Sequence, residues 1–198
     1  KFLFDKGLIY EGYKAMHICP RCETTLANFE VNQGYKDIVD VSVYVKLSVA
    51  AGGFFQVLGN NPQTVQKSST GLVHFLAWTT TPWTLPSNTA LAVGKDIDYD
   101  QIETFNPYTG IKIKVTLASA LVGKYFSAEG AEAPLENYTP QQKILPWRKL
   151  NTQKGSDLEG ACYIQLLPYA QPEEGDAFRV IIGDFVSTED GTGIVHIA

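Results

Sequence analysis

The most informative segment of the chain is Trp78-Thr79-Thr80-Thr81-Pro82-Trp83-Thr84-Leu85-Pro86-Ser87-Asn88. It follows an apolar run at 71–77 that predicts a buried strand. The threonine hydroxyls supply hydrogen-bond donors and acceptors, the two indoles supply bulk, and the two prolines fix the backbone. A strand that ends in such residues can form a small pocket. The alternative is a threonine-rich strand followed by an ordinary proline turn.

Length and composition indicate a globular protein with one domain and room for a small appendage. The chain has 198 residues, of which 44% are hydrophobic and 12% aromatic, enough to form a buried core. We expect no membrane partner and no secretion, because the sequence shows neither a long apolar span nor a signal-like leader. Three cysteines, two of them in one CxxC motif, do not make a disulfide framework, so a cytoplasmic location is expected.

The net charge limits which partners the chain can bind alone. It is −5, from 16 basic and 21 acidic residues, which disfavours a free-standing nucleic-acid binder because such proteins usually present a dense basic face. A pocket for a single nucleotide of an RNA that is held elsewhere is still compatible with this charge. We therefore expect the chain alone to bind RNA weakly.

Hydrophobic periodicity predicts a mainly β fold. Apolar residues alternate strictly over 39–49, as in a half-buried strand, and the pair 99–105 and 111–115 predicts a hairpin. We also expect strands at 54–58, 89–93, 162–167, 178–182 and 193–197, a helix at 116–126, irregular chain at 127–143, and a helix end with two strands around the cysteine turn at 1–36. Many short strands with few helices favour a β-barrel-like domain.

Three separated motifs occur in an order typical of one family. Gly12-Tyr13-Lys14 and Cys19-Pro20-Arg21-Cys22 lead into 26–31, the threonine-rich segment follows, and Gly183-Asp184-Phe185-Val186 precedes the final segment 189–198. Together they closely resemble the tethering ribbon, the threonine-rich peptide and the second editing-site segment of the editing domain of isoleucyl-tRNA synthetases. The sister domains for valine and leucine carry Thr-Arg-Pro where this chain has Thr81-Pro82-Trp83, which favours the isoleucine branch.

The resemblance implies a closed, mostly antiparallel β-barrel with a few peripheral helices over 37–198, and part of the tethering ribbon over 1–36. In that family an aspartate that follows the position of His196 holds the substrate's α-amino group. Asp184, Glu189 and Asp190 precede His196 and do not match the position of that aspartate. We expect an excised piece of a larger protein, truncated at its C-terminal end. A lost charge-assisted hydrogen bond costs about 1.5–3 kcal/mol, so weak or absent hydrolysis is expected from this piece.

The activity that the resemblance implies is hydrolytic proofreading of valyl-tRNA(Ile). One methylene separates isoleucine from valine and is worth only about 1–3 kcal/mol, a limit for which isoleucyl-tRNA synthetases are themselves the standard example. The implied partners are the 3′-terminal aminoacyl-adenosine of tRNA(Ile) and the rest of the synthetase, and the isolated domain is expected to be a monomer. The sequence contains no His-x-Gly-His or Lys-Met-Ser-Lys-Ser signature of ATP binding, so amino-acid activation is not expected.

Six residues are candidates for the editing site. Threonine hydroxyls and backbone groups would position a water for attack on the ester and stabilise the developing oxyanion. Because side chains alternate along a strand, at most two of three consecutive threonines should face one pocket. The resemblance assigns catalysis to Thr80 and Thr81, and substrate binding to Thr79, Trp83, Asn88 and His196.

Several candidates also have a structural interpretation. Thr79 could satisfy the backbone, Trp83 could pack in the core, and Asn88 could be an ordinary turn residue. A lone histidine on a strand is more often structural than catalytic, but the resemblance gives His196 a steric role, in which it excludes isoleucine and need not act as a general base. The other two histidines, His17 and His74, are expected to be structural.

The cysteine turn resembles half of a metal site. Cys19 and Cys22 have zinc-knuckle spacing, but zinc requires four ligands. The resemblance implies that the other pair comes from a returning ribbon outside this chain, and Cys162 has no partner in spacing. Editing itself needs no cofactor, so no metal is assigned, and zinc is expected only with ligands from outside the chain. The motif lies between strands, which argues against a thioredoxin-like redox site.

Two further functions stay open from the sequence. One is a non-catalytic nucleotide- or RNA-binding β-barrel, and the other is a stand-alone trans-editing factor. The helix-tail start and strand-end stop of the chain argue against the stand-alone factor. The pair Trp83 and His196 argues against a pure binding module, because such walls serve to measure an amino acid.

Overall fold

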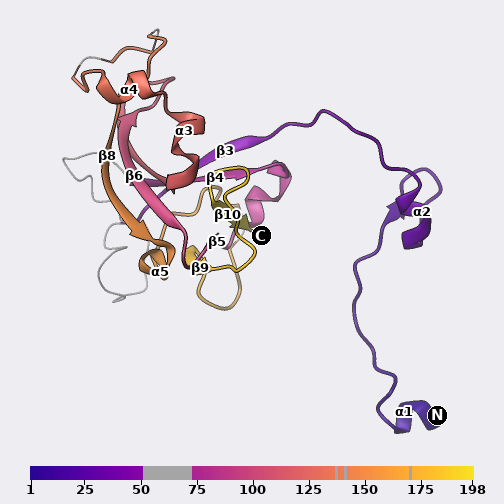
Figure 1. Cartoon of the computed structure of the whole chain (residues 1–198). Coiled ribbons are helices and arrows are strands. Elements are labelled where there is room, and N and C mark those ends of the chain that lie inside the picture. Colours follow the sequence, from indigo (N-terminus) through magenta and orange to yellow (C-terminus); the bar gives the residue numbers. More distant parts are fainter. Residues whose placement is uncertain (51–72, 137, 141, 170) are drawn as a thin grey trace. The chain divides into compact units, whose positions relative to one another are not determined.

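The chain divides into two units, residues 1–40 and 41–198, called here the N-terminal unit and the β unit. The computed structural model describes residues 1–50, 73–136, 138–140, 142–169 and 171–198 (Figure 1). The strand expected at 54–58 lies outside these described residues. Among the described helices, none has the length and apolar character of a membrane span.

The N-terminal unit consists of short local elements. α1 (Phe2–Asp5) precedes the antiparallel pair β1 (Ile18–Cys19) and β2 (Thr24–Thr25), and α2 (Asn28–Asn32) follows. The expected helix end and the two strands around the cysteine turn are confirmed. The sequence pattern does not predict α2, whose first turn is closed by a 2.8 Å hydrogen bond from the Ala27 N–H to the Glu30 carboxylate.

The β unit contains two sheets. The five-stranded sheet has the order β3-β4-β7-β6-β8, and the three-stranded sheet has the order β10-β5-β9. Neighbours pair antiparallel except β4 with β7 and β5 with β9, which are parallel. The strands are β3 (Val43–Ser48), β4 (Val73–Thr79), β5 (Ala90–Val93), β6 (Asp98–Phe105), β7 (Lys112–Ala118), β8 (Trp147–Lys154), β9 (Arg179–Ile182) and β10 (Ile194–Ile197).

A mainly β fold with few helices is confirmed, but the closed antiparallel barrel is wrong for the described residues. The larger sheet has β3 and β8 at its edges, the smaller sheet has β10 and β9, and both include a parallel pair. Alternating hydrophobicity reveals that a strand has one buried face. It does not say which strands pair or in which direction, because the inward-facing side chains are the same in either arrangement.

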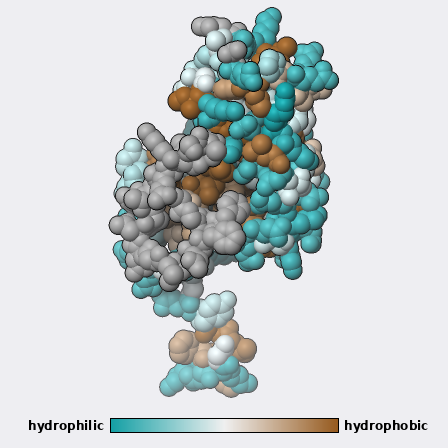
Figure 2. Space-filling model, turned by 90° about the vertical axis from the view of Figure 1, so that its left-hand side faces the viewer, coloured by the Kyte–Doolittle hydropathy of each residue, from teal (hydrophilic) through white to brown (hydrophobic). Residues whose placement is uncertain are grey.

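One hydrophobic core holds both sheets together. It includes Phe75 of β4, Leu91 of β5, Tyr99 of β6 and Val180 of β9, each at most 1% exposed. A second cluster packs α3 (Val122–Tyr125) against β6 and β7. Figure 2 shows hydrophobic and hydrophilic side chains interspersed on the outer face that it draws. Because the first core contains residues of both sheets, the positions of the functional segments depend on contacts between the sheets.

The predicted hairpin of β6 and β7 is confirmed, but the helix predicted at 116–126 is wrong at its start. β7 continues to Ala118, because 116–118 pair with 99–101, and this pairing overrides local helix propensity. The short helices η2 (Ser119–Leu121) and α3 follow. The strand expected at 162–167 is reduced to two isolated bridges, Val49 with Tyr163 and Cys162 with Arg179.

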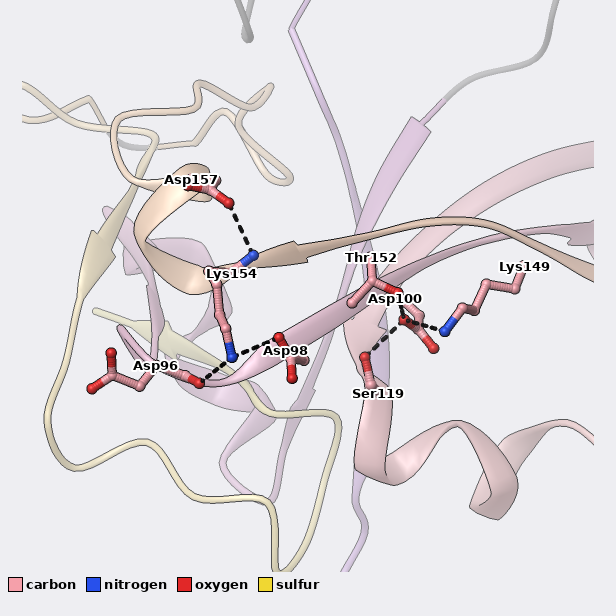
Figure 3. A network of polar contacts seen from close by, with 8 residues as sticks. All are labelled: Asp96, Asp98, Asp100, Ser119, Lys149, Thr152, Lys154 and Asp157. Carbon is pink, nitrogen blue, oxygen red and sulfur yellow. Dashed lines mark hydrogen bonds and ion pairs between the residues drawn. The ribbon is translucent and has the colours of Figure 1, made fainter.

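β8 is an edge strand that the sequence does not predict, because most of its side chains are polar and exposed. Asp100 of β6 accepts hydrogen bonds from Thr152 at 2.6 Å and Ser119 at 2.8 Å, and Lys149 forms an ion pair with it at 3.2 Å (Figure 3). These contacts tie β8 to β6, and Figure 1 shows the two strands side by side. α4 (Ala128–Glu132), within the segment expected to be irregular, and α5 (Gly155–Leu158) complete the β unit.

Candidate functional site

The threonine-rich segment forms a turn at the end of β4. Thr79, the last residue of the strand, is buried, and its hydroxyl accepts the Thr81 N–H at 3.0 Å. This local bond replaces a ladder hydrogen bond and ends the strand. The 3₁₀-helix η1 (Pro82–Ser87) begins directly afterwards with proline, whose fixed φ suits the first helical position. The Thr84 hydroxyl then donates to the Thr81 carbonyl at 2.8 Å and closes the turn.

The C-terminal strand brings His196 to this turn. β10 pairs antiparallel with β5, which places His196 opposite Leu91, just beyond Asn88 at the end of η1. Thr84 Oγ1 lies 2.7 Å from His196 Nε2, and Asn88 Nδ2 lies 3.0 Å from His196 Nδ1. Two segments separated by more than one hundred residues therefore share one hydrogen-bonded cluster.

The hydrogen bonds of this cluster agree on a single tautomer of His196. The Tyr163 hydroxyl donates to Asn88 Oδ1 at 2.6 Å, so the amide NH₂ faces His196 Nδ1, which must accept. Nε2 then carries the proton and donates to Thr84 Oγ1, whose own proton goes to the Thr81 carbonyl. The imidazole of His196 is consequently neutral, with its proton on Nε2.

Burial acts in the same direction as these hydrogen bonds. Desolvation lowers the pKa of His196 below its usual value. Protonation of Nδ1 would also place two donors, this N–H and the Asn88 NH₂, against each other. His196 Nε2 is already engaged with Thr84, so the imidazole is held as a hydrogen-bond donor rather than as a proton acceptor.

The predicted site residues fall into two groups. Thr79, Thr81, Asn88 and His196 belong to the hydrogen-bonded cluster, with Thr79 Oγ1 and Thr81 Oγ1 3.2 Å apart. Thr80 and Trp83 lie outside it. Trp83 is 67% exposed, so its indole does not pack in the core of the β unit, and the exposed Thr80 hydroxyl has no hydrogen-bond partner among the described residues. Both are free to contact a ligand.

Contacts from α3 hold the loop before β10. Lys124 Nζ donates to the Glu189 carbonyl at 2.6 Å, and the Tyr125 hydroxyl donates to the Gly191 carbonyl at 2.5 Å. Gly193 has φ +72, and a Cβ there would lie 2.4 Å from Ala118 Cβ. Only glycine fits this close, left-handed passage, which fixes where β10 and His196 begin.

Sequence reasoning missed two members of the cluster, Thr84 and Tyr163. Thr84 had a local signal, because it lies three residues after Thr81 and can reach back to its carbonyl across one turn. Tyr163 had none, because it reaches Asn88 only through the packing of segments 75 residues apart.

The cysteine turn of the N-terminal unit offers two thiols. Backbone N–H groups of Cys22 and Arg21 lower the pKa of Cys19, and the Cys19 thiol raises the pKa of Cys22. Among the described residues no group of three or more His, Cys, Asp or Glu side chains is placed to hold a metal. Two thiolates are half of a zinc ligand set, so a complete site would need ligands from elsewhere.

Comparison with known proteins places the chain among aminoacyl-tRNA synthetases. The family model for tRNA synthetases class I (I, L, M and V) matches residues 1–188. The chain is 48% identical to the isoleucine–tRNA ligase of Cytophaga hutchinsonii, 46% to that of Bacteroides fragilis strain ATCC 25285 and 39% to that of Thermoplasma volcanium, covering 100% of this chain each time. It spans only 17%, 16% and 15% of those relatives, respectively.

A solved structure shares the fold at lower identity. The crystal structure of GlLeuRS-CP1 matches 79% of this chain and 52% of its own, with a TM-score of 0.50 and 17% identity. The P. knowlesi cytosolic leucyl-tRNA synthetase editing domain matches 78% of this chain and 57% of its own, with a TM-score of 0.49 and 13% identity.

Proposed function

This chain belongs to the class I tRNA synthetases (I, L, M and V) and resembles isoleucine–tRNA ligases over its whole length, and we propose that it is their editing domain. In this proposal it hydrolyses the ester that joins valine to the 3′-terminal adenosine of tRNA(Ile). The rest of the synthetase supplies tRNA binding and amino-acid activation.

The observation that carries the proposal is the meeting of the threonine-rich turn with His196. A neutral imidazole held by Thr84 and Asn88 forms a wall of fixed position next to Thr81. Such a wall can admit a valyl side chain and collide with the extra methylene of an isoleucyl side chain. The chemistry needed is steric selection beside hydroxyl groups, and the cluster supplies both.

The proposed mechanism is attack of a water on the ester carbonyl, which breaks the bond between that carbonyl carbon and the ribose oxygen. Valine leaves as the free acid, and one proton of the water ends on the ribose oxygen, which becomes the terminal hydroxyl of tRNA(Ile). The hydroxyls of Thr80 and Thr81 orient that water and donate to the oxyanion that develops, which is the largest contribution in most acyl-transfer sites. Trp83, exposed beside them, contacts the aminoacyl-adenosine. His196 does not take the proton, because its Nδ1 already accepts from Asn88 and its Nε2 carries a proton.

The net charge of −5 explains why the domain would depend on the rest of the synthetase. Binding of nucleic acid depends on neutralising phosphates with lysine and arginine, and acidic residues outnumber basic ones here. We therefore expect the 198-residue chain alone to cleave valyl-tRNA(Ile) slowly at best. No metal takes part in the proposed hydrolysis, and zinc at Cys19 and Cys22 would have a structural role with ligands from outside these residues.

Deacylation assays test this proposal. Valyl-tRNA(Ile) and isoleucyl-tRNA(Ile) are incubated with a synthetase that contains this segment, and with a double variant, Thr80→Ala with Thr81→Ala. We expect the parent to cleave only the valyl ester and the double variant to lose at least about tenfold in rate, as expected when oxyanion donors are removed. The control is Thr109→Ala, in the exposed β6–β7 turn. Equal rates for the parent and the double variant would refute the proposed site.

A further inference from the structure

Tyr163 is a buried tyrosine, and its hydroxyl, the one polar group of its side chain, points at the candidate site. It is 0% exposed, and its hydroxyl donates to Asn88 Oδ1 at 2.6 Å. The residue lies in the core cluster shared by the two sheets, outside the motifs that predict the site. Burial raises the pKa of the phenol above its usual value, so the hydroxyl keeps its proton and acts as a donor at every physiological pH.

The backbone around Tyr163 fixes where that hydroxyl lies. The Tyr163 N–H donates to the Phe178 carbonyl at 2.9 Å, and the Phe178 N–H donates to the Thr89 carbonyl at 2.6 Å, next to Asn88. Phe178 has φ +61, a left-handed conformation that is costly for an aromatic residue. Its ring packs edge-on against Tyr163, with centroids 6.2 Å apart. Phe178 therefore links the backbone of Tyr163 to that of Thr89, the residue next to Asn88.

The Asn88 amide connects Tyr163 to His196. Its oxygen accepts from Tyr163, and its NH₂ faces three acceptors: the carbonyls of Ala90 and Ile197, and His196 Nδ1. The hydroxyl of Tyr163 and the two backbone carbonyls thus select the same orientation of the amide. Without the hydroxyl, Oδ1 is buried without a donor and the amide is held from one side only.

We propose that Tyr163 is a positioning residue that, through Asn88, holds His196 as the Nε2–H tautomer with this proton directed at Thr84. Because Tyr163 is 0% exposed, its hydroxyl acts through Asn88 rather than on a substrate. Its effect on selectivity rests on the proposed editing function, because only then does His196 measure an amino acid. Its effect on the tautomer of His196 does not depend on that function.

The ¹⁵N NMR signals of the His196 ring test the proposal in the full 198-residue chain. We expect Tyr163→Phe to lower the population of the Nε2–H tautomer, by roughly two- to tenfold for the loss of one neutral hydrogen bond. Asn88→Asp should shift the ring further, because a carboxylate accepts from Nδ1 and favours a proton there. The matched control is Thr104→Val, which removes another buried hydroxyl, bonded to the Pro146 carbonyl away from the cluster.

A double-mutant cycle separates positioning from general stabilisation. If Tyr163 acts through Asn88, Tyr163→Phe has no further effect on the His196 tautomer when Asn88 is already aspartate, whereas independent effects would add. Unchanged His196 signals in Tyr163→Phe, or signals changed equally by Thr104→Val, overturn the proposal. If Tyr163→Phe fails to fold, the parent chain decides, because a His196 ring that carries its proton on Nδ1 there refutes the proposal.

The consequence for selectivity is measured separately in the synthetase that contains this segment. Tyr163→Phe should reduce the preference for valyl-tRNA(Ile) over isoleucyl-tRNA(Ile) by about two- to tenfold, and Thr104→Val should preserve it. Absence of valyl-tRNA(Ile) hydrolysis in the parent would refute the editing function and leave the NMR result to decide the role of Tyr163. An unchanged preference in an active Tyr163→Phe enzyme would refute the inferred effect on selectivity.

Discussion

Thr84 Oγ1 lies 2.7 Å from His196 Nε2, although 112 positions separate the two residues in the sequence. The contact joins the turn after β4 to the last strand of the chain. It holds the proton-bearing edge of the imidazole at a fixed place beside Thr81. The candidate site is therefore a product of sheet pairing, and its two halves can be tested independently.

Removal of the imidazole should remove the steric wall. We expect His196→Ala to raise the rate of isoleucyl-tRNA(Ile) hydrolysis by roughly 10- to 100-fold, because discrimination that depends on one methylene is of about this size. The measurement is deacylation of isoleucyl-tRNA(Ile) by a synthetase that contains this segment. The control is His17→Ala, an exposed histidine of the N-terminal unit. Continued rejection of isoleucine by His196→Ala would contradict the steric role.

The hydroxyl of Thr79 should contribute to stability through the turn. Thr79→Val keeps the shape but removes the acceptor for the Thr81 N–H, and the expected loss in the free energy of unfolding is about 1–2 kcal/mol. Thr80→Val is the matched control, because its exposed hydroxyl has no partner among the described residues, and it should change stability by less than about 0.5 kcal/mol. Urea unfolding measures both, and equal losses would argue against the turn bond.

Gly193 should tolerate no side chain. Gly193→Ala combines φ +72 with a Cβ 2.4 Å from Ala118 Cβ, so we expect a loss of several kcal/mol, beyond the usual range for single substitutions. Gly160→Ala is the control: its φ is +78, but nothing lies within 4 Å of the added Cβ. The loss of stability in Gly160→Ala therefore measures the cost of the left-handed backbone conformation alone, about 1 kcal/mol. Similar thermal denaturation temperatures for the two variants would show that crowding at Ala118 is unimportant.

His74 should make the fold less stable in mild acid. Burial, and then the nearby charge of Lys46, lower the pKa of His74 to about 4, whereas an unfolded histidine titrates near 6.5. Below pH 6.5 the unfolded state takes up the proton first, so the stability present above 6.5 is lost as the pH falls toward 4. Between pH 7 and 5 the expected loss is roughly 1–2 kcal/mol.

Urea unfolding at both pH values checks this prediction. His74→Gln should reduce the difference between them, because it removes the titrating group at the Ser48 contact. His17→Gln, on the exposed N-terminal unit, should leave the difference as it is. A pH dependence that persists unchanged in His74→Gln would assign the effect to other groups.

The sequence alone predicted those strands and turns whose pattern lies in residues close together in the chain. The hairpin of β6 and β7 followed from side-chain periodicity and turn residues. The strand expected at 39–49 is confirmed only over β3 (Val43–Ser48), because 39–42 are exposed and lie outside it. Sequence reasoning failed at β8, because an exposed edge strand carries no apolar stripe, and at 116–118, where pairing with β6 decided the conformation. The closed barrel was what the resemblance implied, and periodicity could not test it, because periodicity counts strands but does not pair them.

For the candidate site the division is similar. Residue identity and order determined the family, the threonine-rich turn and the participation of Asn88 and His196 as candidates. Only the tertiary structure decided that Thr84 and Tyr163 belong to the same cluster and that His196 carries its proton on Nε2. The physical reason is that a tautomer depends on which donors and acceptors surround the ring, and these come from strands paired across the whole chain.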